Sequence, residues 1–260
     1  MLNYSIHNEL SPNPIWFVFV HGFTGSLEAW NIVKDILSAK VNNPILLIDN
    51  LGSGRSPQPN GGYTTDMMAD SIIEVMEKLA IKQIYLVGHS LGGAIAQKIA
   101  LKKQQSIAHL FVVSSFLKLN KVAQYFLQSR YELQKANVDR RLIALSAIAS
   151  IFGQKFLLDN NNVEFAIQRV IDNPQQLPGI YGQLHACLNH DTEESIVQLK
   201  CDTTIITGKE DILIHPTHSL LIKQKLPHAK LYQIADAGHV LPLEAPHQLV
   251  EVIIELINQM

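Results

Sequence analysis

Residues 83–93 read Gln-Ile-Tyr-Leu-Val-Gly-His-Ser-Leu-Gly-Gly, an apolar run that ends at a serine flanked by glycines. Residues 83–87 predict a short buried strand, and residues 91–102 predict a helix. Gly88-His89-Ser90-Leu91-Gly92 therefore lies at a strand-to-helix turn, where glycines permit a sharp bend that exposes the serine hydroxyl. Ser90 as a simple helix cap is the alternative, but a cap does not need a small residue on each side. We predict that Ser90 is a nucleophile.

Short apolar runs alternate with longer helical patterns along the rest of the chain. This alternation is typical of the α/β class, in which a mostly parallel sheet is flanked by helices. An antiparallel edge strand is expected at residues 2–7. The expected strands are residues 15–20, 44–48, 83–87, 108–113, 203–207 and 230–234, and the expected helices are residues 26–38, 65–79, 91–102, 216–225 and 246–258.

Residues 114–202 interrupt this alternation, because a crossover between two parallel strands needs far fewer residues. They predict a helical lid inserted into a core made of residues 1–113 and 203–260. Helices are expected at residues 122–134, 141–152 and 163–172, and Asn160-Asn161-Asn162 is expected to form a turn.

Two features of the insertion bear on substrate selection. Val122, Tyr125, Phe126 and Ser129 form a helical stripe that faces either the pocket or, as we favour, the core of the lid itself. The glycines at positions 153, 179 and 182 are candidate hinges.

A serine hydroxyl needs a base to take its proton. His239 directly follows the expected strand 230–234, in the loop Asp236-Ala237-Gly238-His239. Loops at the carboxyl ends of parallel strands carry the ligands of open α/β sheets. We therefore predict that His239 is the base. The other histidines lie outside this position, and no pair has the spacing of metal ligands.

A carboxylate must orient this imidazole and stabilise its charged form. Asp211 follows the expected strand 203–207, one loop before His239, and is the preferred candidate. Glu210 has similar chemistry, and Asp236 is near His239 in sequence, so both remain open.

Acyl transfer also needs hydrogen-bond donors for the oxyanion. The turn itself offers the backbone N–H of Leu91. The loop after the strand at residues 15–20 reads His21-Gly22-Phe23-Thr24-Gly25 and offers the N–H of Phe23. The Phe23 ring is expected either to line the pocket or to be an ordinary core aromatic. Substrate contacts are expected from His21, Gly22, Phe23 and His89.

Composition excludes several other classes of function. The 260 residues are 47% apolar and carry 21 basic against 23 acidic side chains, which gives no case for a nucleic-acid partner. Residues 1–14 lack the features of a secretory signal, and no apolar run is long enough to span a membrane. Cys187 and Cys201 have no metal or redox spacing and suggest a reducing, cytoplasmic location. No metal or other cofactor is expected.

The chain resembles the α/β-hydrolase family over nearly its whole length. The resemblance rests on five ordered motifs: residues 21–23, 49–56 (Asp-Asn-Leu-Gly-Ser-Gly-Arg-Ser), 88–93, 208–211 and 238–246. It implies a serine–histidine–acid triad that cleaves a small-molecule or carrier-bound carboxylic ester or thioester through an acyl-enzyme. The five motifs are specific for the fold and the triad rather than for the substrate.

Two alternatives accompany this interpretation. The residues His21 to Ser26 look like the opening motif of the menaquinone-pathway lyase that eliminates pyruvate with the same triad. That subfamily has a tyrosine before the nucleophile and an arginine just past the turn, where this chain has His89 and Ala94. The second alternative is a non-catalytic ligand-binding protein of the same fold. Dehalogenase or epoxide hydrolase chemistry is disfavoured, because those relatives carry an aspartate at the position of Ser90.

Overall fold

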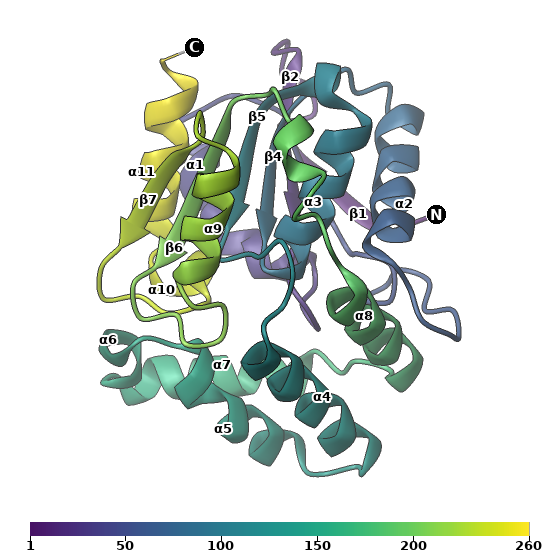
Figure 1. Cartoon of the computed structure of the whole chain (residues 1–260), viewed down its shortest axis with the longest axis vertical. Coiled ribbons are helices and arrows are strands. Elements are labelled where there is room, and N and C mark those ends of the chain that lie inside the picture. The colour runs from purple at the N-terminus through teal and green to yellow at the C-terminus, as the bar shows by residue number, and fades with distance from the viewer. Residues whose placement is uncertain (260) are drawn as a thin grey trace.

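The computed structural model describes residues 1–259, and a seven-stranded sheet forms its centre (Figure 1). The strands lie in the order β1-β3-β2-β4-β5-β6-β7. Strand β1 runs antiparallel to β3, and the other neighbouring pairs of this sheet are parallel, as expected. The strands are Tyr4–His7 (β1), Ile15–Val20 (β2), Ile45–Ile48 (β3), Gln83–His89 (β4), Ile107–Val113 (β5), Thr203–Gly208 (β6) and Lys230–Ile234 (β7).

Helices cover both faces of the sheet (Figure 1). One face is covered by α1 (Asn31–Ser38), α10 (Leu241–Glu244) and α11 (Pro246–Ile257). The other is covered by α2 (Thr65–Lys78), α3 (Leu91–Lys102) and α9 (Thr217–Lys225). Short 3-10 turns occur at Leu27–Trp30, Gln104–Ser106 and Ile196–Gln198.

The alternation of side chains along the strands produces two separate core layers. In β2, Phe17 and Phe19 pack in the layer under α1 and α11. Val18 and Val20 point the opposite way, into the layer under α2 and α3. Successive side chains of a strand lie on opposite faces, so a strand covered on both sides is apolar throughout. The continuous apolar run at residues 15–20 has this cause.

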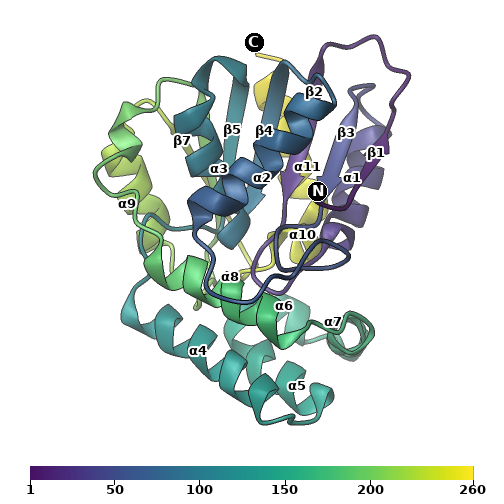
Figure 2. The same ribbon diagram turned by 90° about the vertical axis from the view of Figure 1, so that its right-hand side faces the viewer.

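All of the helices α4–α8 lie between β5 and β6 and form a layer beside one edge of the sheet (Figure 2). They are Lys121–Lys135 (α4), Arg140–Ile151 (α5), Gln154–Leu157 (α6), Asn160–Asp172 (α7) and Leu177–Asn189 (α8). Helices were expected where α4, α5 and α7 lie, but α6 and α8 were not.

The predicted turn at Asn160-Asn161-Asn162 is wrong. These residues form the first turn of α7, because the Asp159 side chain accepts a hydrogen bond from the Asn161 N–H at 2.9 Å. A carboxylate at this position satisfies a donor that the helix itself leaves free. Asparagine propensity favours a turn, and the preceding cap overrides it.

The predicted hinges at Gly179 and Gly182 are also wrong, because both lie inside α8. A Cβ on Gly179 would lie 2.2 Å from the Gly52 carbonyl oxygen, and one on Gly182 would lie 2.2 Å from the Tyr63 ring. These glycines let the helix pack directly against the loop that holds Gly52 and Tyr63. Their low helix propensity concealed α8 in the sequence.

Most of the stripe predicted on α4 faces outward, although Phe126 is partly buried and packs against the core under α2 and α3. Val122 is 65% and Tyr125 is 68% exposed, whereas Ala123 and Leu127 of the same helix are buried. The buried face is therefore displaced around the helix from the one that the larger apolar residues suggested.

Within residues 1–259, no helix is both long enough and apolar enough to cross a bilayer. Cys187 and Cys201 are free thiols, the first buried and the second partly exposed.

Candidate active site

The sheet register brings the predicted site loops to one edge. Val20 of β2 pairs with Gly88 of β4, and His89 of β4 pairs with Val113 of β5. Gly208 at the end of β6 pairs with Ile234 at the end of β7. The loops that follow these parallel strands therefore open on the same side, where open α/β sheets bind their ligands.

Ser90 lies between β4 and α3 with a φ of 56° and a ψ of −121°. This conformation is unfavourable for a residue with a side chain and persists only where neighbouring contacts impose it. The Ser90 N–H donates to the Val113 carbonyl at 2.9 Å, and the Ser115 hydroxyl donates to the Ser90 carbonyl at 2.7 Å. The turn is thus held from the adjacent strand.

The glycines around Ser90 are required by close backbone approaches. A Cβ on Gly88 would lie 2.3 Å from the Gly92 carbonyl oxygen, and a Cβ on Gly92 would lie 2.1 Å from the Val20 carbonyl oxygen. Such contacts cannot be accommodated without moving the backbone. The small residues that suggested a sharp turn in the sequence are therefore explained by packing of α3 against β2 and β4.

His239 lies within hydrogen-bond distance of both Ser90 and Asp211. Its Nε2 atom is 3.0 Å from the Ser90 Oγ atom, and its Nδ1 atom is 2.8 Å from the Asp211 Oδ2 atom. A carboxylate only accepts, so we assign the Nδ1 proton to the bond with Asp211, which leaves Nε2 to accept from the hydroxyl. The Asp211 side chain is fully buried. Its second oxygen, Oδ1, accepts from the Ile214 N–H at 2.7 Å.

The other two candidate acids lie apart from the imidazole. The Glu210 Oε2 atom accepts a hydrogen bond from the Gln154 N–H at 2.6 Å, at the start of α6. Asp236 is exposed and adopts a positive φ of 54° at the turn before His239. Of the three carboxylates, Asp211 is the one that contacts His239 in this structure.

The two predicted oxyanion donors flank Ser90. Leu91 is the first residue of α3, and Gly22, which precedes Phe23, lies so close that a Cβ on it would be 3.1 Å from the Ser90 Cβ. Among residues 1–259, neither the Leu91 N–H nor the Phe23 N–H has an acceptor. The Phe23 ring is partly buried and packs against the core under α2 and α3, as its alternative interpretation held.

His21 has a structural role beside the site, and its contact with substrate stays a prediction. It is fully buried; its Nδ1 atom bonds the Gly22 carbonyl at 2.8 Å, and its Nε2 atom accepts from the Asn50 N–H at 3.1 Å. Burial lowers the pKa of His21. Both ring nitrogens therefore fix the loop at residues 21–25 and its contact with Asn50.

His89 has a similar supporting position. Its Nε2 atom donates to the His239 carbonyl at 2.8 Å, and its ring packs against the His239 ring with centroids 4.9 Å apart. Burial, with the nearby His239, lowers the pKa of His89 to about 3. A neutral His89 thus holds the backbone of His239, and it also lines a small hollow together with His21 and Val240, so that its contact with substrate stays a prediction.

Glu244 was not among the predicted site residues, although it lies in the last motif of the sequence. Its Oε2 atom accepts from the N–H groups of Gly153 and Gly238 at 2.7 and 2.8 Å, and its Oε1 atom accepts from the Val240 N–H at 2.8 Å. Burial raises its pKa, while these three donors act in the opposite direction. One carboxylate thereby fixes the residues on both sides of His239.

The described residues contain no group of three or more histidine, cysteine, aspartate or glutamate side chains arranged to hold a metal ion. The site is built instead from a strained serine, a histidine and a buried aspartate on three loops of one sheet edge.

The mostly parallel sheet and the strand-to-helix turn that carries Ser90 are features of the α/β-hydrolase fold. Residues 15–246 match the family described as alpha/beta hydrolase fold, and the chain belongs to that family.

Curated relatives match along almost the whole chain at low identity. The chain is 20% identical to a putative carbamate hydrolase, RutD, of Stutzerimonas stutzeri, over 92% of this chain and 89% of that protein. It is 26% identical to the uncharacterized hydrolase YugF of Bacillus subtilis, over 95% of this chain and 92% of that protein.

Solved structures agree in fold. A thermophilic esterase from Thermogutta terrifontis has a TM-score of 0.86 at 21% identity, covering 99% of this chain and 93% of that one. The enol-lactonase from Burkholderia xenovorans LB400 has a TM-score of 0.88 at 19% identity, covering 99% of this chain and 96% of that one.

Proposed function

We propose that this protein is a serine hydrolase that cleaves a carboxylic ester or thioester through an acyl-enzyme on Ser90. The observation that carries the proposal is the unbroken line of hydrogen bonds from Asp211 through His239 to the Ser90 hydroxyl. Three side chains from separate loops meet in the order that general-base activation of a serine requires. Membership of a hydrolase-fold family supports the same class of reaction.

Each residue then has a distinct part in the reaction. The Ser90 Oγ atom attacks the carbonyl carbon while His239 Nε2 takes its proton, and the same proton passes to the departing alcohol or thiol. Asp211 holds the imidazole in the required tautomer. The N–H groups of Leu91 and Phe23 stabilise the oxyanion, and the positive end of α3 adds to this effect. Water activated by His239 afterwards releases the acid.

The helices α4–α8 are proposed to act as a lid, within the boundaries 114–202. The segment between α5 and α6 is joined to both catalytic loops: the His239 N–H donates to the Ile151 carbonyl at 2.9 Å, and the Gln154 N–H donates to Glu210. A lid anchored there restricts access of water and determines which acyl groups reach Ser90.

The decisive experiment is labelling of the purified protein with a fluorophosphonate, combined with turnover of p-nitrophenyl acetate and butyrate. Ser90→Ala is expected to abolish both signals. Ser129→Ala, at an exposed lid serine, is the matched control and should change neither. Absence of labelling and turnover in the unmodified protein would refute a serine hydrolase.

The leaving group and the acyl chain need a wider screen. Relatives named as putative carbamate hydrolases and as esterases make aryl carbamates and esters of graded chain length the first series. A carrier-protein thioester tests a protein-bound substrate. A pyruvate-release assay tests the lyase alternative, and ligand binding that is unchanged by Ser90→Ala without turnover would indicate the non-catalytic alternative.

A further inference from the structure

A cavity of about 420 Å³ lies between the helical insertion and the sheet domain, next to the candidate active site. Its wall includes Thr24 and Val240, which are the chain neighbours of Phe23 and His239. Consecutive Cα atoms are about 3.8 Å apart, so this wall begins one residue away from the proposed base and from a proposed oxyanion donor. The volume suits a small organic ligand.

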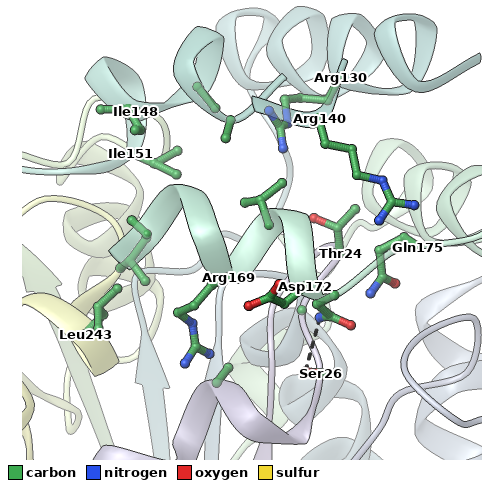
Figure 3. A pocket seen from close by; sticks show the side chains of 18 of the residues that line it. Thr24, Ser26, Arg130, Arg140, Ile148, Ile151, Arg169, Asp172, Gln175 and Leu243 are labelled. Atoms are coloured by element: carbon green, nitrogen blue, oxygen red, sulfur yellow. Dashed lines mark hydrogen bonds between the residues drawn. The ribbon is translucent and has the colours of Figure 1, made fainter. Parts of the chain in front are cut away.

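Three arginines from three different helices line this cavity: Arg130 of α4, Arg140 of α5 and Arg169 of α7 (Figure 3). They lie 10 and 29 positions apart in the sequence, and the packing of the inserted helices places them around one space. None of them has a carboxylate within 4.0 Å among residues 1–259. The neighbouring Arg141 differs, because it forms an ion pair with Glu164 on the outer surface.

Each of the three guanidinium groups is held by a backbone carbonyl. Arg130 donates to Ile143, Arg140 donates to Ile171 at 3.0 Å, and Arg169 donates to Glu28 at 3.3 Å. A guanidinium has five N–H donors, so these bonds fix the side chains and leave further donors for a ligand. Burial lowers the pKa of Arg130 to about 10, which still leaves it charged at neutral pH.

Two carboxylates also belong to the wall, and the charge of one of them, Glu28, acts on Arg169 against the effect of burial, which lowers the pKa of that arginine. Glu28 and Asp172 are both exposed, and the Asp172 Oδ1 atom accepts from the Gln168 side chain at 2.7 Å. Three cationic and two acidic side chains therefore share the wall, which leaves an excess of positive charge. A partly buried cation without a counter-ion is unfavourable unless something supplies the charge.

Gln175 provides an independent indication of a polar ligand. Its side-chain nitrogen and oxygen are both buried, and neither has a hydrogen-bond partner among the described residues. Figure 3 shows its amide group beside the Arg140 guanidinium, at the wall of the cavity. Buried polar atoms are rarely left unpaired. A group that accepts hydrogen bonds from Arg140 and from the Gln175 side-chain nitrogen would pair one of these two atoms.

We propose that this cavity binds a carboxylate on the acyl part of the substrate, so that the enzyme acts on monoesters of dicarboxylic acids. The inference rests on the proposed function, since it names the substrate class of the same site. Arg140 and Gln175, which lie side by side (Figure 3), hold the free carboxylate, and the ester group extends past Val240 toward Ser90. Arg169, on the other side of α7, adds positive charge to the same cavity. Bidentate contact with a planar carboxylate is the recognition for which guanidinium is best suited.

The test compares mono-p-nitrophenyl adipate and suberate with p-nitrophenyl hexanoate and octanoate, their neutral counterparts of equal acyl length. We expect a kcat/KM at least about 10-fold higher for the anionic esters, because charged hydrogen bonds are stronger than neutral ones. Arg140→Gln and Arg169→Gln should each lower the value for the anionic esters about 10- to 100-fold, leaving the neutral esters within about 3-fold.

Controls separate recognition of charge from structural damage. Arg141→Gln, whose side chain is paired with Glu164, should leave both classes of ester unchanged. Arg169→Lys keeps the charge and should recover part of the loss. The proposal would be overturned if the unmodified enzyme showed no preference for the anionic esters. It would also be overturned if the arginine variants lost kcat/KM equally on neutral and anionic esters, because the arginines would then only stabilise the packing of the helices.

A binding measurement tests the carboxylate site separately from the proposed hydrolase activity. Calorimetric titration of Ser90→Ala with adipate measures binding to the cavity in a variant that cannot form an acyl-enzyme. Binding that is lost in Ser90→Ala/Arg169→Gln supports the cavity even if no ester is cleaved. Failure of adipate to bind Ser90→Ala overturns it, even if neutral esters are cleaved by the unmodified enzyme.

Discussion

The Nδ1 atom of His239 lies 2.8 Å from the Oδ2 atom of Asp211, although 28 positions of the chain separate the two residues. Strands β6 and β7 pair in parallel with Gly208 opposite Ile234, so the loops after both strands leave the sheet at the same place. The adjacent Glu210 instead reaches the Gln154 N–H. The choice between two neighbouring acids is thus made by the direction in which each side chain leaves the loop.

Asp211→Asn is expected to lower kcat for p-nitrophenyl butyrate about 10³- to 10⁴-fold, because an amide no longer imposes the required tautomer on His239. Steady-state kinetics measure the loss. Glu210→Gln is the neighbouring control and should cost far less. A large loss in Glu210→Gln together with a mild one in Asp211→Asn would mean that the acid is assigned to the wrong residue.

Glu244→Gln is expected to lower kcat about 10-fold or more, because an amide replaces one acceptor oxygen among the donors of Gly153, Gly238 and Val240. The same change should reduce the free energy of unfolding by about 1–3 kcal/mol. Kinetics and urea denaturation measure the two effects. Glu251→Gln, at an exposed position of α11, should alter neither quantity. Unchanged kinetics in Glu244→Gln would show that His239 is positioned without it.

Gly182→Ala is expected to reduce the free energy of unfolding by about 1–3 kcal/mol, because the new methyl group would lie 2.2 Å from the Tyr63 ring. In a Tyr63→Leu background the same substitution should reduce the free energy of unfolding by a smaller amount, because the ring has been removed. Urea denaturation of the four proteins of this double-mutant cycle measures the coupling. Additive costs would contradict direct packing of α8 against Tyr63.

Acid is expected to destabilise the fold through its buried histidines. Burial, with the nearby Lys98, lowers the pKa of His190 to about 3, and burial lowers that of His109 to about 4. Each binds fewer protons in the folded state than in the unfolded chain, whose histidines titrate near pH 6.5. The stability is therefore complete above pH 6.5 and is lost as the pH falls toward these lower values.

His190→Asn isolates one part of this effect. Between pH 7 and pH 5 its free energy of unfolding should fall by about 1–2 kcal/mol less than that of the unmodified protein. Urea denaturation at both pH values provides the comparison, whatever the cost of the substitution at pH 7. His228→Asn, at an exposed position, should keep the original pH dependence. An identical fall in His190→Asn would show that other groups cause the acid sensitivity.

The strands, the long helices that flank the sheet and the turn around Ser90 were predictable from the sequence, because local periodicity and turn residues indicate them. The run at residues 15–20 is apolar throughout since both faces of β2 are covered, and glycines at 88 and 92 signal a close approach of α3. Two predictions for the insertion were wrong because intrinsic propensity is overridden there. Asp159 caps the start of α7, and the glycines of α8 allow close packing inside a helix.

Contacts between distant segments were decided by the tertiary structure. The sequence contained Asp211, Glu210 and Asp236 as candidate acids, and the pairing of β6 with β7 places only the first of these three against His239. The same holds for the supporting positions of His21 and His89. Arg130, Arg140 and Arg169 form no motif, because the distances that bring them around one cavity depend on how the inserted helices pack. The sequence gives the chemistry of each side chain. The directions of the side chains and the distances between them depend on how the strands pair and how the helices pack.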